Sequence, residues 1–74
     1  MKNWAARNLA ISISLEAAEL LECFQWSDDG EKNQVEDELA DILIFAALLS
    51  NVMKIDLSKA VERKLLIDKQ RNWK

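Results

Sequence analysis

Two pairs of acidic residues, each pair three positions apart, are the side chains in this sequence best suited to chemistry. The first pair is Glu16 and Glu19 in LEAAELLECFQW, and the second is Glu38 and Asp41 in EDELADILIF. Residues three apart on a helix project from the same face, so each pair can act as a two-pronged ligand. Both pairs interrupt apolar stretches, where an ionised carboxylate without a partner is costly.

A hard divalent cation would compensate for four carboxylates gathered at one point. Mg²⁺ prefers oxygen ligands in octahedral geometry and commonly bridges to phosphates, and Mn²⁺ is the alternative ion. The sequence has no histidine and one cysteine, Cys23, which excludes imidazole catalysis, cysteine-rich zinc sites and intrachain disulfides. Spacing alone leaves a simpler interpretation open, in which the acids lie on solvated helix faces and pair with lysine or arginine.

Composition predicts that helices position these acids. The chain has 74 residues, 50% of them hydrophobic, with one glycine and no proline, so we expect a single all-α domain over residues 1–74. Helices are expected over Trp4–Trp26, Gln34–Lys54 and Leu57–Asn72. The segment SDDGEKN separates the first two, which should form an antiparallel hairpin whose acidic pairs face each other.

The third helix should begin at a cap supplied by Asp56 or Ser58. It is expected to turn Leu57, Val61 and Leu65 inward, with Leu66 as a further candidate, and to present a basic outer face.

The second predicted helix is apolar on all sides past Asp41, which is typical of a helix buried between several neighbours. Three helices cannot enclose so many apolar residues, and below roughly 70–80 residues a single core rarely stabilises a fold alone. We therefore expect a homodimer or a dimer of dimers, in which helical hairpins form four-helix bundles between chains.

Net charge and hydropathy limit the classes of partner and the location that we expect for this protein. The formal net charge is −3, with 13 acids and 10 bases, which argues against binding a nucleic acid polymer. The N-terminal MKNWAARN lacks the apolar region of a signal peptide, and ILIFAALL is too short to span a bilayer. The expected protein is cytoplasmic and does not enter a membrane.

The sequence segments around the acids resemble those of the MazG-like nucleotide pyrophosphohydrolases, an all-α superfamily. The order is Glu16-x-x-Glu19, a spacer of eighteen residues, then Glu38-x-x-Asp41. The stretches NLAISISLEAAELLECFQW, ELADILIF and IDLSKAVERK look like the branch that contains dCTPases and integron-associated MazG proteins. The similarity covers nearly the whole chain, from Asn8 to about Arg71.

The resemblance implies hydrolysis of nucleoside triphosphates to the monophosphate and pyrophosphate, a house-cleaning of the nucleotide pool. It implies that Glu16, Glu19, Glu38 and Asp41 hold Mg²⁺, and that a deoxynucleotide, possibly similar to dCTP, is the substrate. Either Glu19 or Glu22 could accept the proton of the attacking water, and the sequence leaves that choice open.

Five residues are candidates for holding the nucleotide. Trp26 could stack on a base, a contact worth about 1–3 kcal/mol in single-strand complexes, or it could plug the core at the helix end. Asn8 could read a base edge. Phe45 stands where related enzymes often have tyrosine, so core packing is its simpler role. Lys64 and Arg71 match phosphate-binding positions of the family, or they belong to a solvated basic face.

Two departures from the family pattern support a second hypothesis. Asp68 stands where related sequences carry asparagine, and Asn72-Trp73 replaces Tyr-Pro. An acid beside phosphate is unfavourable. The alternative is therefore a catalytically impaired MazG-like helical oligomer that acts as a binding or assembly module.

Overall fold

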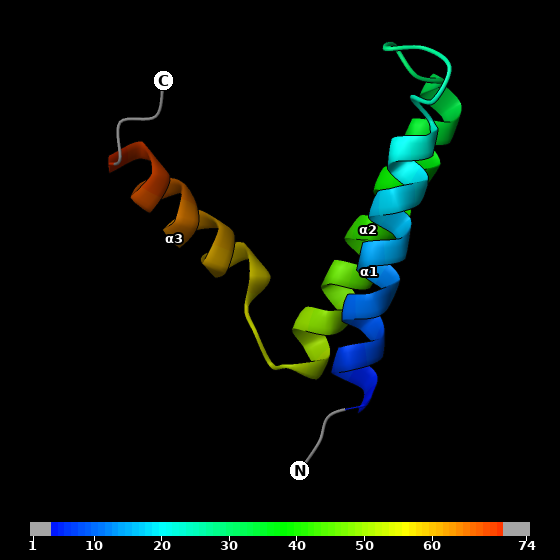
Figure 1. The fold of residues 1–74 in the computed structure, drawn as a ribbon. Coiled ribbons are helices and arrows are strands. Elements are labelled where there is room, and N and C mark those ends of the chain that lie inside the picture. The colour runs from blue at the N-terminus through cyan, green and yellow to red at the C-terminus, as the bar shows by residue number, and fades with distance from the viewer. Residues whose placement is uncertain (1–3, 71–74) are drawn as a thin grey trace.

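A computed structural model describes residues 4–70, which form three α-helices and no strand (Figure 1). The helices are α1 (Trp4–Glu22), α2 (Lys32–Val52) and α3 (Leu57–Gln70). The predicted all-α fold is therefore confirmed for the described residues. Arg71, and the expected end of the third helix at Asn72, lie outside them.

The first two helices form the antiparallel hairpin that the sequence predicts, side by side along their lengths (Figure 1). Their facing sides carry half-buried apolar residues, among them Leu9, Ile13 and Leu20 on α1 and Ile42 and Leu49 on α2. Among residues 5–70, whose burial the structure describes, none is fully buried. The hairpin is thus held together by one shared apolar face and has no enclosed core.

The first helix ends at Glu22, four residues before the predicted Trp26. The next three N–H groups, of Cys23, Phe24 and Gln25, each donate to the carbonyl three residues earlier, at 3.0–3.1 Å. This i to i+3 pattern tightens the chain and ends the α-helix. In the turn that follows, Gly30 has a φ of 71°, and the ring of Phe24 lies where a side chain on Gly30 would stand.

A side-chain cap sets the start of α2, and backbone conformation sets its end. The Glu31 carboxylate accepts the backbone N–H groups of Asn33 and Gln34 at 3.2 and 3.3 Å, so the helix begins two residues before its predicted start. It ends at Val52, two residues early, because Lys54 has a left-handed φ of 57°. The N–H of Ile55 then donates to the Ser50 carbonyl at 2.8 Å, which closes the helix end.

The third helix begins at the predicted cap and then leaves the hairpin. The Asp56 carboxylate accepts the Lys59 N–H at 3.1 Å, which selects Asp56 over Ser58 as the capping residue. From there α3 extends away from α1 and α2 (Figure 1). Val61 is 50% exposed and Leu65 63% exposed, so the expected inward packing of this helix is wrong for a single chain.

The chain is more open than a folded monomer of its size. Its radius of gyration is 15.1 Å, whereas about 11 Å is expected for 74 residues. It exposes 6572 Å², whereas a folded monomer of 8.5 kDa exposes about 4,700 Å². The excess of about 1,900 Å² is more than twice what each partner buries in a standard protein interface.

Among the described helices, none is long and apolar enough to cross a membrane.

Candidate metal centre

Antiparallel packing brings acids from both pairs together across the hairpin. Glu16 on α1 and Glu38 and Asp41 on α2 each offer a carboxylate oxygen, and these three oxygens lie within 4.8 Å of one another. Because the helices run in opposite directions, the middle of α1 lies beside the first half of α2 (Figure 1). Three of the four predicted ligands therefore converge on one point.

Two oxygens of this cluster are buried without a hydrogen-bond partner. They are Oε2 of Glu16 and Oε1 of Glu38, on side chains that are themselves half-buried. The pKa of Glu16 is raised to about 7, chiefly by the neighbouring Glu38 carboxylate, which can share a hydrogen bond with Glu16 only while one of them holds a proton. Partial burial and then the nearby Glu19 add to this pKa shift. The cluster thus needs either a proton or a cation.

The donor set fits a hard divalent cation. Its members are all carboxylate oxygens, the ligands preferred by Mg²⁺ and Mn²⁺, and the two orphaned oxygens gain a partner when such an ion binds. Glu19 does not place an oxygen within the converging set, although it is close enough to Glu16 to raise its pKa. Its role as fourth ligand stays a prediction.

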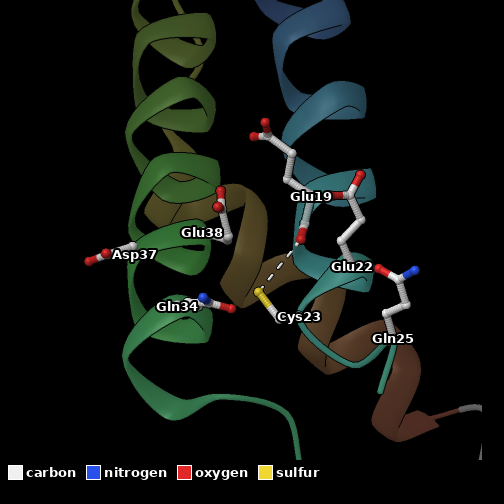
Figure 2. A pocket seen from close by; sticks show the side chains of 7 residues that line it. All are labelled: Glu19, Glu22, Cys23, Gln25, Gln34, Asp37 and Glu38. Atoms are coloured by element: carbon white, nitrogen blue, oxygen red, sulfur yellow. Dashed lines mark hydrogen bonds between the residues drawn. The ribbon is translucent and has the colours of Figure 1, made fainter. Parts of the chain in front are cut away.

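A polar pocket of about 300 Å³ adjoins the cluster on the side of the inter-helix turn. Its lining residues are Glu19, Glu22, Cys23, Gln25, Gln34, Asp37 and Glu38. Figure 2 shows Gln34 pointing from α2 toward Cys23, whereas Asp37 points away from the pocket. Both candidate proton acceptors, Glu19 and Glu22, therefore border the space beside the carboxylates.

Cys23 and Gln34 are pocket residues that the sequence did not single out. Partial burial and the nearby Glu38 carboxylate raise the pKa of the Cys23 thiol. The protonated thiol donates to the Glu19 carbonyl at 3.6 Å, as the dashed line in Figure 2 shows. Neither a lone thiol nor a lone amide follows a spacing rule, so only the antiparallel pairing of α1 and α2 reveals them.

The candidate base-binding residues lie apart from one another. Asn8 is exposed two turns before Glu16 on α1, and Phe45 is half-buried one turn after Asp41 on α2. Trp26 lies in the inter-helix turn and is 90% exposed, so the alternative in which it plugs the core is wrong for the single chain. None of the three lines the pocket described above. Their contacts with a nucleotide stay predictions.

Of the two predicted phosphate ligands, Lys64 is not brought to the acids within one chain. Lys64 lies on α3, which leads away from the hairpin, and its ammonium pairs with Asp68 at 3.5 Å. Arg71 is outside the described residues. The departure at Asp68 noted in the sequence thus has a structural counterpart, because this acid holds the lysine proposed to bind phosphate.

Comparison with known proteins supports the resemblance read from the sequence. The model of the MazG-like family matches residues 11–74. The chain is 35% identical to dCTP pyrophosphatase 1 of Homo sapiens over 75 residues, which cover 88% of this chain and 44% of the relative. The proteins of that name from Rattus norvegicus and Mus musculus are 33% identical with the same coverage. The chain spans less than half the length of these relatives.

No solved structure matches this chain. The family match nevertheless includes both acidic pairs, the pocket between the helices and all of α2 and α3. It extends over most of the chain and agrees with the all-α hairpin seen here. The chain belongs to the MazG-like family.

Proposed function

We propose that this protein is a divalent-cation-dependent nucleoside triphosphate pyrophosphohydrolase, with Mg²⁺ as its usual ion and Mn²⁺ as the alternative. The observation that carries the proposal is the convergence of Glu16, Glu38 and Asp41 oxygens within 4.8 Å, two of these residues having an unpartnered buried oxygen. A magnesium–triphosphate complex is a ligand that suits such an all-oxygen cluster. The names of the relatives, dCTP pyrophosphatases, support the same reaction.

In the proposed reaction, water attacks the α-phosphorus, the bond to the β-phosphate oxygen breaks, and the monophosphate and pyrophosphate leave. Glu16, Glu38 and Asp41 hold the ion, with Glu19 as the fourth proposed ligand. The bound cation would neutralise phosphate charge and assist departure of pyrophosphate. Glu19 or Glu22, which border the adjoining pocket, would accept the proton that the water loses.

The proposed substrate is a deoxynucleoside triphosphate similar to dCTP, by analogy with the named relatives. Trp26 is exposed and free to stack on a base, and Asn8 and Phe45 stay candidate contacts on the other side of the acids. These assignments rest on the family likeness, because the described chain does not bring the three residues together.

We also propose that the protein works as a homodimer or a dimer of dimers in the cytoplasm. The surface of α2 exposes four large apolar residues in two pairs spaced four residues apart, Leu39 with Leu43 and Ile44 with Leu48. Packing this surface against the same surface of a second hairpin would form a four-helix bundle between chains. Because α3 leaves its own hairpin, Lys64 would reach a nucleotide only within such an assembly.

Pyrophosphate release from a panel of deoxynucleoside triphosphates, with and without Mg²⁺, tests the catalytic proposal. The wild type should release pyrophosphate, and Glu38→Gln should lower the rate by at least about a hundredfold, because it removes a charged oxygen from the cluster. Glu36→Gln is the matched control, since Glu36 is an exposed acid on the same helix outside the cluster. Absence of release from every nucleotide at high protein concentration overturns the proposal.

The second candidate is a binding or assembly module without turnover. The ion pair between Lys64 and Asp68 favours it, because it occupies a predicted phosphate ligand. Calorimetry of Mg²⁺ and nucleotide binding, read together with the pyrophosphate assay, separates the candidates. A pure scaffold binds neither Mg²⁺ nor nucleotide, an impaired enzyme binds both without turnover, and the proposed enzyme binds both and releases pyrophosphate.

A further inference from the structure

Gln34 brings an uncommitted amide to the pocket beside the three converging carboxylates. It lies one turn before Glu38 on α2, so the two side chains share a face of that helix. Figure 2 shows its carboxamide directed toward Cys23 on α1. Among residues 4–70 this carboxamide forms no hydrogen bond, whereas the Glu31 carboxylate binds the backbone N–H of Gln34. The amide is therefore free to bind a molecule that enters the pocket.

The other side chains of the pocket offer acceptors and few donors. An ionised carboxylate only accepts hydrogen bonds, and Glu19 and Glu38 are among the acids that line this space. The Cys23 thiol already donates to the Glu19 carbonyl at 3.6 Å. Gln25 lines the pocket from beyond the end of α1, farther from α2 than Cys23 is (Figure 2). Of the lining side chains, Gln34 is thus the one that brings N–H donors to the face of α2 that carries Glu38.

A pocket lined by acids admits neutral water more readily than phosphate. A triphosphate is strongly anionic, so ionised Glu19, Glu22 and Glu38 repel it from this space. The volume of about 300 Å³ is well above the roughly 30 Å³ that one water occupies in the liquid, so water can enter. The pocket is therefore suited to the attacking water. Because displacement at phosphorus is in line, pyrophosphate should leave on the side away from the pocket.

The attacking water has two protons and two lone pairs to place. In the proposed reaction one proton passes to Glu19 or Glu22, and another carboxylate of the pocket can accept a hydrogen bond from the second. One lone pair forms the bond to the α-phosphorus while the bond to the β-phosphate oxygen breaks. The other lone pair is left for an N–H donor, which the acids cannot supply. A glutamine amide supplies that donor without adding charge, and glutamine also orients the attacking water in GTP-hydrolysing proteins.

We propose that Gln34 is a positioning residue that holds the attacking water beside Glu19 and Glu22. Its amide N–H donates to the water oxygen, so that the remaining lone pair points at the α-phosphorus and one proton points at the accepting carboxylate. The inference rests on the proposed pyrophosphohydrolase function and adds a residue to it. Because Gln34 acts through the water and not on the cation or the nucleotide, its loss should affect turnover and leave binding unchanged.

Steady-state cleavage of dCTP tests this role. The Gln34 side chain is exposed, so its variants should keep the wild-type urea midpoint. Gln34→Ala should lower kcat about tenfold, the loss expected for one hydrogen bond to the water, with KM changed less than about twofold. Gln34→Glu keeps the shape but loses the N–H donors, so kcat should fall at least as far. Gln25→Ala and Gln25→Glu are the matched controls in the same pocket, with kcat expected within about twofold of the wild type.

Binding without turnover gives a second readout. Calorimetry is done with Mg²⁺ alone and then with Mg²⁺ and α,β-imido-dCTP, whose bridging nitrogen resists cleavage. Gln34→Ala should bind both with dissociation constants within about twofold of the wild type, since the carboxylates that hold the ion are unchanged.

The possible results separate the role of Gln34 from the proposed function. A wild-type kcat in Gln34→Ala or Gln34→Glu overturns the positioning role alone. Weaker binding of Mg²⁺ or of the imido analogue by Gln34→Ala also overturns it, because Gln34 would then hold the ion or the nucleotide. Equal losses of kcat in the Gln25 variants overturn it as well, because the effect would not be specific to Gln34. A wild type that releases no pyrophosphate overturns the proposed function and this role together.

Discussion

Binding of a divalent cation to the Glu16–Glu38–Asp41 cluster should expel a proton, so that affinity rises with pH. The neighbouring Glu38 carboxylate, with partial burial and Glu19, raises the pKa of Glu16 to about 7. A cation needs this carboxylate ionised, so the proton must leave when the ion binds. With that pKa, about nine in ten chains hold the proton at pH 6, about half at pH 7 and about one in ten at pH 8.

The apparent dissociation constant for Mg²⁺ should therefore fall about tenfold between pH 6 and pH 8, with most of the change below pH 7. Isothermal titration calorimetry at pH 7, in two buffers of different ionisation enthalpy, should count about 0.5 proton released per ion. Glu36→Gln should behave as the wild type, and Glu16→Gln should lose the proton release. Equal Mg²⁺ affinity at pH 6 and pH 8, with no proton released at pH 7, would refute this reasoning.

The same pKa shift gives the sign of the pH dependence of stability without metal. Below the ordinary pKa of 4.5, Glu16 is protonated in both the folded and the unfolded chain, so it causes no loss. Between pH 4.5 and about pH 7 the unfolded chain ionises first, so the folded state loses stability as pH rises. Above about pH 7 the loss is complete, and saturating Mg²⁺ should reverse it.

Three further predictions concern the fold and are measured by urea unfolding. Gly30→Ala should cost about 1–3 kcal/mol, because the new methyl meets the Phe24 ring at 2.7 Å and the backbone is left-handed; an unchanged midpoint contradicts this. Lys54→Val should be at least about 1 kcal/mol less stable than Lys54→Gly, since only glycine accepts a φ of 57° without strain. Asp56→Ala should cost about 1 kcal/mol through the lost cap, and Ser58→Ala should cost less than half of that.

Periodicity and composition predicted the helices well, and their ends less well. Three helices and the antiparallel hairpin follow from apolar spacing around one glycine-containing turn. The early end of α1 was missed because the residues after Glu22 continue the apolar pattern, whereas the backbone tightens there into i to i+3 hydrogen bonds. The early end of α2 was missed because lysine at position 54 is not a usual left-handed residue.

The candidate site was predictable as far as helix geometry reaches. Spacing placed Glu16, Glu38 and Asp41 on faces that meet once the hairpin closes, and the structure brings their oxygens together. The position of Lys64 was not predictable. Apolar spacing shows which side of α3 is suited to packing, but it does not show whether the helix that packs there comes from the same chain or another. Gln34 was missed for a related reason, since it joins the pocket only through its neighbour on the other helix.

The most direct test of the central claim is the product analysis of dCTP turnover by ³¹P NMR, with Mg²⁺ titrated from zero. The proposed site predicts that dCTP is converted to equal amounts of monophosphate and pyrophosphate, that turnover requires Mg²⁺ or Mn²⁺, and that Glu38→Gln suppresses it while Glu36→Gln does not. Products of diphosphate and inorganic phosphate, turnover without a divalent cation, or an intact substrate at every Mg²⁺ concentration would contradict the account.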